Sequence, residues 1–217
     1  MSKPRHIPPA AVMAVLLAVL ALTAYLASAP QGNRIYVACV GDSITEGSSY
    51  VHDLERLLGG NYSVGNFGTG FSSVSLATPK PYINQQVFVG AKNFHPNIVI
   101  IMLGTNDART DNQGLIGNFS QDFKQLIGEF KTLSTKPQVY LVVPPPILDN
   151  TLGLNSTILE QQVIPQIRQI ANQTSTPLID FHQEMATHPE YFEDGVHPTV
   201  EGSAFIAEKV FEAIKTQ

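Results

Sequence analysis

Short apolar runs that alternate with helical patterns are the feature of this 217-residue sequence that most constrains its fold. Continuous β-branched runs such as 35–40 and 98–103 predict strands buried on both faces, because a half-solvated strand would alternate apolar and polar residues. Strands in alternation with helices predict an α/β fold of three layers, with helices on both faces of a five-stranded parallel sheet. The predicted strands are 34–40, 62–66, 98–102, 138–143 and 178–180. The predicted helices are 50–58, 84–94, 120–133, 158–173 and 200–215.

The N-terminal segment 1–33 is set apart from this alternation. Two basic residues, Lys3 and Arg5, precede an uncharged apolar run, 10–29, which is long enough to span a bilayer. We therefore expect residues 1–33 to be an export signal or signal anchor and residues 34–217 to be one exported domain. The stretch 27–29 (ASA) fits a cleavage site, but Pro30 after it disfavours the cut. Membrane anchoring by a single helix and secretion after cleavage both stay open.

Composition excludes several classes of function. The net charge is −5 and no basic cluster occurs in the body of the chain, so we expect no nucleic-acid groove and no membrane contact outside residues 10–29. The glycine-rich stretch 68–70 lacks the third glycine of a dinucleotide fingerprint, and no P-loop ending occurs. Histidines 52, 95, 182 and 188 are scattered without metal-ligand spacing. We expect neither a metal nor an organic cofactor.

The segment 41–47, with the sequence GDSITEG, places Ser43 directly after the first predicted strand. Glycines at both ends of the segment allow a tight turn, and the unpaired N–H groups of a helix start point toward whatever the serine hydroxyl attacks. A polar run of this kind is equally typical of an ordinary helix cap. Ser43 is therefore a candidate nucleophile that needs support from elsewhere in the chain.

A carboxylate and an imidazole three residues apart, Asp194 and His197, occur in the DGVHP segment near the C-terminus. A serine hydroxyl is a poor nucleophile until an imidazole accepts its proton, and that imidazole needs an acceptor on its other nitrogen. Taken alone, the Asp-Gly and His-Pro pairs favour a surface turn. As a set with Ser43, these residues supply a nucleophile, a base and the partner that orients the base.

Two further segments favour an active site over a turn. Asn106 lies in the GTND segment directly after the strand 98–102, and the glycine-rich segment 66–70 (NFGTG) lies at the end of the second strand. Open α/β sheets bind their ligands at the carboxyl ends of the strands. We expect both segments at the same edge of the sheet as Ser43.

In chain order, the GDS, Asn- and Gly-rich, GTND and DGVHP segments resemble the SGNH (GDSL) hydrolases over residues 34–217. The resemblance implies a flavodoxin-like SGNH hydrolase fold and a serine hydrolase that needs no cofactor. It implies that Ser43 is the nucleophile and donates its own N–H to the oxyanion. It also implies that Asn106 donates to the same oxyanion from its side chain, that His197 is the base and that Asp194 orients it.

The second of these segments departs from the family pattern. Related sequences read like N-x-x-x-x-G, which would place the glycine donor of the oxyanion hole at position 71, and this position is Phe71. A loop shortened by one residue would bring Gly70 into the donor place. We favour Gly70 over Gly68 as the donor.

Irregular stretches at 72–82 and 144–155 are rich in Ser, Pro and Gly, and we expect them to be substrate-binding loops over the rim of the sheet. The candidate pocket residues in or beside them are Phe71, Tyr82, Ile147 and Leu148. The same side chains would serve equally well to pack the loops onto the domain.

The sequence therefore predicts an exported serine esterase that acts on a small-molecule or glycan ester through an acyl-enzyme. Short O-acyl groups on carbohydrates, above all O-acetyl groups, are the first choice of substrate. A lysophospholipase-like or thioesterase-like acylhydrolase that acts on longer acyl chains is the alternative. An inactive glycan-binding domain of the same fold is the alternative of another class, and the presence of all four polar site residues counts against it.

Overall fold

The structure of the protein is a computed structural model that describes residues 13 and 34–215. The chain divides into two units, Met1–Asn33 and Arg34–Gln217. The second unit contains the described fold.

A five-stranded sheet with the strand order β2-β1-β3-β4-β5 forms the centre of this unit, and every adjacent pair of strands is parallel. The strands are β1 (Ile35–Gly41), β2 (Tyr62–Gly68), β3 (Ile98–Met102), β4 (Gln138–Val142) and β5 (Leu178–Ile179). All five residues of β3 are buried, as are the last five of β1. Continuous burial of this kind is typical of parallel strands covered on both faces, and the predicted α/β class is confirmed.

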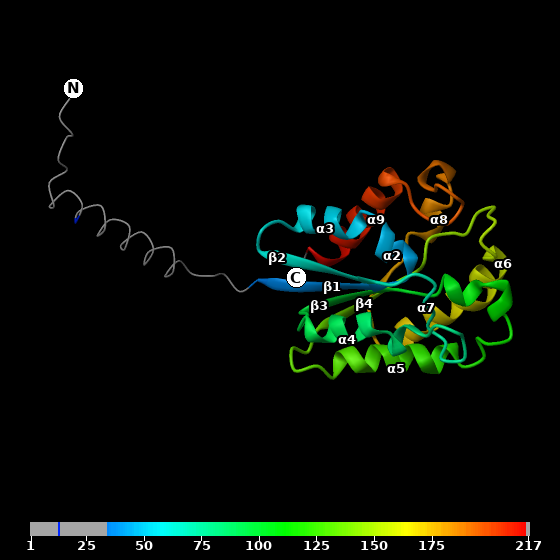
Figure 1. The fold of residues 1–217 in the computed structure, drawn as a ribbon, viewed down its shortest axis with the longest axis horizontal. Helices are drawn as coiled ribbons and strands as arrows, with labels where there is room; N and C mark the ends of the chain where they lie inside the picture. Colours follow the sequence, from blue (N-terminus) through cyan, green and yellow to red (C-terminus); the bar gives the residue numbers. More distant parts are fainter. Residues whose placement is uncertain (1–12, 14–33, 216–217) are drawn as a thin grey trace, which may run out of the picture. The chain divides into compact units, whose positions relative to one another are not determined.

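Helices cover both faces of the sheet (Figure 1). The α-helices are α2 (Ser43–Gly47), α3 (Tyr50–Leu58), α4 (Gln86–Asn93), α5 (Phe119–Lys131), α6 (Ser156–Ile158), α7 (Ile164–Gln173), α8 (His182–Met185) and α9 (Val200–Ile214). Figure 1 shows α3 and α9 on one face and α4, α5 and α7 on the other. The face of α9 turned to the core carries Ile206, Val210 and Ile214 at helical spacing, which is why this helix packs along one stripe.

Short helical turns connect the larger elements: η1 (Tyr82–Asn84), η2 (Asn106–Ala108), η3 (Thr110–Asn112), η4 (Leu159–Val163) and η5 (Pro189–Tyr191). The predicted helix 158–173 is interrupted by η4, a π-helical turn in which the Ile164 N–H donates to the Leu159 carbonyl. Pro165 follows directly and has no N–H to continue the regular ladder. The wider turn accommodates this loss of a donor.

The strand order places a topological switch point between β1 and β3. The chain leaves β1 toward β2 on one side and returns to β3 on the other side. A crevice outside the carboxyl ends of the strands is the expected ligand site at such a point. Ser43 and Asn106, which follow β1 and β3, lie at this edge.

The apolar run predicted to reach the membrane, 10–29, lies outside the described residues except for residue 13. Within the part of the chain that the structure describes, none of the helices combines the length and apolarity needed to cross a bilayer.

Candidate active site

Ser43 is the first residue of α2, where β1 turns sharply into helix. Asp42 caps this helix, and its Oδ1 accepts the Ile44 N–H at 3.0 Å. The turn requires glycine before it, because a Cβ on Gly41 would lie 1.9 Å from Thr45 Oγ1 and 2.9 Å from the Met102 carbonyl oxygen. The helix start therefore fixes the serine at the edge of the sheet.

A tight turn before α9 carries the histidine and its carboxylate. Asp194 Oδ1 accepts two backbone N–H groups, from Val196 at 3.0 Å and from His197 at 2.8 Å. Gly195 has a φ of 85°, and a Cβ there would lie 2.2 Å from the Asp149 carbonyl oxygen. Only glycine fits this position without displacing the loop after β4.

A chain of hydrogen bonds joins the three predicted residues. Ser43 Oγ lies 2.9 Å from His197 Nε2, and His197 Nδ1 lies 2.7 Å from Asp194 Oδ2. With the Nδ1 proton donated to the carboxylate, Nε2 is free to accept the serine proton. Partial burial opposes ionisation of Asp194, but the two backbone N–H groups and the imidazole together hold the pKa of this carboxyl below its usual value. The carboxylate is therefore ionised and able to stabilise an imidazolium.

Besides the Ser43 N–H, the predicted oxyanion donors are the Asn106 side chain and the N–H of one glycine, Gly70 or Gly68. Asn106 in η2 is 4% exposed, and its Nδ2 donates to the Ser72 carbonyl at 3.0 Å. The Gly70 N–H donates to Glu46 Oε2 at 2.7 Å, beside Ser43. The Gly68 N–H is engaged at 2.9 Å by Asn66 Oδ1 within its own turn. Of the two glycines, Gly70 lies at the pocket and Gly68 does not.

The pocket at Ser43 has a volume of about 200 Å³. It is lined by Ser43, Glu46, Gly70, Phe71, Asn106, Arg109, Leu152, Leu154 and His197. Pockets for drug-sized ligands begin at about 300 Å³, so this one suits a small group. Its apolar lining consists of the side chains of Phe71, Leu152 and Leu154.

Three of the predicted pocket residues lie elsewhere, and that part of the prediction is corrected. Tyr82 is fully buried in the core and donates its hydroxyl to the Phe67 carbonyl at 2.6 Å. Ile147 and Leu148 line a different surface cavity, which shares Leu154 with the pocket at Ser43. Packing of the loops onto the domain, the other use considered for these side chains, accounts for Tyr82. Phe71 alone of the four lines the pocket at Ser43.

Asp107 organises the site without entering the pocket. Its two carboxylate oxygens accept the N–H groups of Val74 and Ser75, each at 2.9 Å, so it anchors the loop after β2 to η2. Burial raises the pKa of Asp107 to about 7, and the charge of Asp42 acts in the same direction. Burial likewise raises the pKa of Asp42 to about 6. No sequence pattern indicates this anchor beyond the position of Asp107 next to Asn106.

Glu46, Arg109, Leu152 and Leu154 also line the pocket and were not among the predicted site residues. Glu46 and Arg109 each lie three residues after a predicted site residue, Ser43 and Asn106, and that spacing is the only signal in the sequence. In the part of the chain that the structure describes, no group of three or more His, Cys, Asp or Glu side chains could hold a metal ion.

The model of the GDSL-like lipase/acylhydrolase family matches residues 39–205. The chain belongs to this family. The predicted resemblance to SGNH (GDSL) hydrolases is thereby confirmed, and membership classes the chain as a carboxylic ester hydrolase.

One relative of this GDSL-family hydrolase is an acetylxylan esterase from Xylanibacter ruminicola, 30% identical over 213 residues. The match covers 86% of this chain and 44% of the relative, so the chain spans less than half of that protein's length.

Solved structures of the same fold include a lipase/acylhydrolase from Enterococcus faecalis, with a TM-score of 0.69, 20% identity and coverage of 84% of this chain and 96% of that one. A carbohydrate acetylesterase from Sinorhizobium meliloti has a TM-score of 0.67, 18% identity and coverage of 84% of this chain and 99% of that one. At these identities, the likeness shows the fold.

Proposed function

We propose that this GDSL-family hydrolase is a serine esterase that removes O-acetyl or other short O-acyl groups from carbohydrates. The observation that carries the proposal is the hydrogen-bonded chain Asp194–His197–Ser43 opening into a pocket of about 200 Å³. A binding domain would have no need for a serine hydroxyl held 2.9 Å from an imidazole that is itself oriented by a carboxylate.

In the proposed reaction, Ser43 Oγ attacks the ester carbonyl carbon while its proton passes to His197 Nε2. The negative charge that develops on the carbonyl oxygen is stabilised by the N–H of Ser43, the N–H of Gly70 and the side chain of Asn106. The sugar hydroxyl then leaves with the proton from His197, and an acyl-enzyme remains. A water molecule, deprotonated by His197, attacks the acyl carbon; the bond to Ser43 Oγ then breaks, His197 returns the proton to this oxygen, and the carboxylic acid is released.

Two observations support short acyl groups. The pocket is small, about 200 Å³, and leucines 152 and 154 are among its lining residues, which leaves room for an acetyl group more readily than for a long chain. The relative from Xylanibacter ruminicola is an acetylxylan esterase. Hydrolysis of longer acyl esters or thioesters is the alternative activity.

A series of p-nitrophenyl esters from acetate to palmitate tests this proposal, together with acetic acid release from acetylated xylan. We expect kcat/KM to be highest for acetate and to fall with chain length, and we expect acetylated xylan to be deacetylated. The Ser43→Ala variant is the matched control for spontaneous hydrolysis. A maximum at long chains would favour the acylhydrolase alternative, and inactivity on every ester would overturn the proposal.

We also propose that the protein is exported, on the basis of Lys3, Arg5 and the apolar run 10–29. Fractionation of cells that express the full chain tests this. We expect the protein in the membrane fraction, resistant to carbonate extraction, with its original N-terminus. A soluble extracellular product that begins between residues 24 and 34 would indicate a cleaved signal, and an uncleaved product in the cytoplasm would overturn export.

A further inference from the structure

A second cavity, of about 230 Å³, lies next to the pocket at Ser43. It is lined by Phe71, Thr78, Pro79, Lys80, Arg109, Asp111 and Asn112. Phe71 and Arg109 line both cavities, and the Arg109 guanidinium lies 5.9 Å from the centroid of the Phe71 ring. These two side chains therefore lie at the boundary between the small pocket at Ser43 and a second, more polar cavity.

Phe71 is exposed, and packing of the core does not explain a phenylalanine at this position. Its side chain is 70% exposed, so it contributes little to the core. Its φ of 61° places a bulky residue in the left-handed region, which is unfavourable for side chains of this size. Unfavourable backbone conformations of this kind gather at ligand sites, where the surrounding structure holds them in place.

The backbone on both sides of Phe71 is held by hydrogen bonds. The preceding residue, Gly70, donates its N–H to Glu46 and accepts Lys80 Nζ at 2.7 Å through its carbonyl. On the other side, Ser72 Oγ donates to the Thr69 carbonyl at 2.7 Å. The ring is therefore presented at the rim by a fixed loop.

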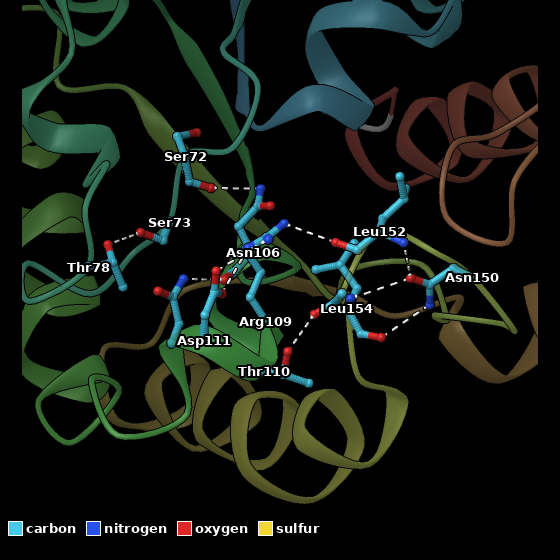
Figure 2. Close-up of polar contacts among 12 residues, drawn as sticks. Ser72, Ser73, Thr78, Asn106, Arg109, Thr110, Asp111, Asn150, Leu152 and Leu154 are labelled. Atoms are coloured by element: carbon cyan, nitrogen blue, oxygen red, sulfur yellow. Dashed lines mark hydrogen bonds and ion pairs between the residues drawn. The ribbon is translucent and has the colours of Figure 1, made fainter.

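Arg109 is equally fixed (Figure 2). Its Nε donates to Asp111 Oδ1 at 3.0 Å, and its Nη1 donates to the Leu152 carbonyl at 3.1 Å. Asn150 in turn accepts the Leu152 N–H at 3.0 Å. Because two acceptors hold its guanidinium, Arg109 is fixed between Phe71 and Leu152, and a ligand meets a preformed surface.

The second cavity has the chemistry of a sugar site. One aromatic residue lines it together with polar residues that include Asp111 and Lys80. Among the described residues, Lys80 has no carboxylate partner, and its Nζ bonds only to Gly70 and to Thr69 Oγ1 at 3.3 Å. A pyranose presents a face of C–H groups, which suits the negative face of a ring, and a rim of hydroxyls, which suits charged and amide groups.

We propose that this cavity binds the sugar unit next to the one that carries the ester, with Phe71 as the stacking surface. The proposal rests on the proposed esterase function and narrows it. The enzyme acts on acetylated oligosaccharides and polysaccharides in preference to acetylated monosaccharides, because two adjacent sugar units occupy two adjacent sites.

The kinetic test compares two substrates in the full-length protein: an acetylated xylo-oligosaccharide, which fills both sites, and p-nitrophenyl acetate, which reaches only the first. The measured quantity is kcat/KM for the oligosaccharide divided by kcat/KM for p-nitrophenyl acetate. We expect Phe71→Ala to lower this ratio about tenfold, because KM for the oligosaccharide rises. Phe71→Tyr, which keeps the ring, restores the ratio. Val89→Ala, which truncates an exposed apolar residue on α4, is the control and leaves the ratio unchanged.

If Phe71 had only a structural role, Phe71→Ala would change kcat/KM for both substrates by the same factor and leave the ratio constant. That result would overturn the inference while the esterase function stands. A wild type that hydrolyses neither substrate would overturn both.

A binding measurement separates recognition from chemistry. We expect calorimetry to detect binding of unacetylated xylotetraose to the Ser43→Ala variant. We expect the double variant Ser43→Ala, Phe71→Ala to bind it about tenfold more weakly. Equal affinity in the two variants would overturn the sugar site whatever the kinetics show.

Discussion

The Gly70 N–H donates to the carboxylate of Glu46 at 2.7 Å, at the edge of the pocket that holds Ser43. Glu46 lies on α2, one helical turn after the serine, and its side chain reaches across to the loop after β2. One N–H cannot donate with good geometry to a carboxylate and to a developing oxyanion at once. Gly70 can serve the reaction only after Glu46 has moved away.

Removal of this competing acceptor should therefore raise turnover. For Glu46→Ala, we expect kcat on p-nitrophenyl acetate to rise about three- to tenfold, since a hydrogen bond to a charged group no longer has to be broken. Glu46→Gln keeps a weaker, neutral acceptor and should give an intermediate value. A tenfold or larger loss of kcat in Glu46→Ala would show instead that the carboxylate assists the reaction.

The nucleophile assignment predicts a covalent signature. A fluorophosphonate probe should label Ser43, and Ser43→Ala should lose about 1,000-fold or more in turnover while its circular dichroism spectrum stays that of the wild type. Peptide mapping by mass spectrometry identifies the labelled residue. Labelling at another serine would contradict the assignment.

Loss of the Asn106 side chain should lower kcat much more than it changes KM. Loss of one oxyanion donor typically costs about 100- to 1,000-fold in kcat, so we expect a fall of this size for Asn106→Ala with KM little changed. Because Nδ2 also donates to the Ser72 carbonyl, thermal unfolding of the variant must be measured beside the kinetics. A fall in kcat of less than tenfold in a folded variant would remove Asn106 from the oxyanion hole.

The sequence predicted the sheet well because its central strands are buried on both faces. The observed β3 matches the predicted 98–102, and the other strands differ from their predicted bounds by at most two residues. The pairing of Ser43 with His197, 154 residues later, was predicted from the base that a serine nucleophile requires and from the resemblance to the SGNH hydrolases.

The walls of the pocket were harder to predict, because loop paths depend on single polar contacts rather than on periodicity. Leu152 reaches the pocket since its carbonyl accepts Arg109 Nη1 and its N–H is held by Asn150. As an aromatic residue in a loop, Tyr82 is equally suited to a pocket and to packing, and its hydroxyl donates to a buried acceptor, the Phe67 carbonyl. None of these three contacts leaves a pattern in the sequence.

The position of the loop after β2 can be tested by alanine substitution of the two candidate donor glycines, Gly68 and Gly70. A Cβ on Gly68 would lie 2.2 Å from the Glu46 backbone nitrogen, whereas a Cβ on Gly70 would lie 3.0 Å from the flexible end of the Glu46 side chain. We therefore expect Gly68→Ala to lower the melting temperature by several degrees, since backbone must shift, and Gly70→Ala to lower it much less. Equal melting temperatures for the two variants would contradict this placement of the loop.

Asp107 should make stability depend on pH. Burial raises the pKa of this carboxyl to about 7 in the folded protein, against about 3.9 in an unfolded chain. Between these values, the folded state binds more protons than the unfolded state, so the free energy of unfolding should fall as the pH rises from about 4 to about 7. The slope contributed by one such group is at most about 1.4 kcal/mol per pH unit. Asp42, with a pKa raised to about 6, contributes in the same direction.

Asp107→Asn removes the titrating group and keeps one of its two acceptor oxygens. Urea unfolding measures the free energy of unfolding of both proteins at pH 5 and pH 8. Between these two pH values, we expect this free energy to fall less in the variant than in the wild type. Glu160→Gln, at an exposed position on η4, is the control for the loss of one charge. Parallel pH profiles for wild type and Asp107→Asn would mean that the buried carboxyl does not take up a proton in this range. The hydrogen bonds from Val74 and Ser75 would then hold it ionised throughout, against the effect of burial.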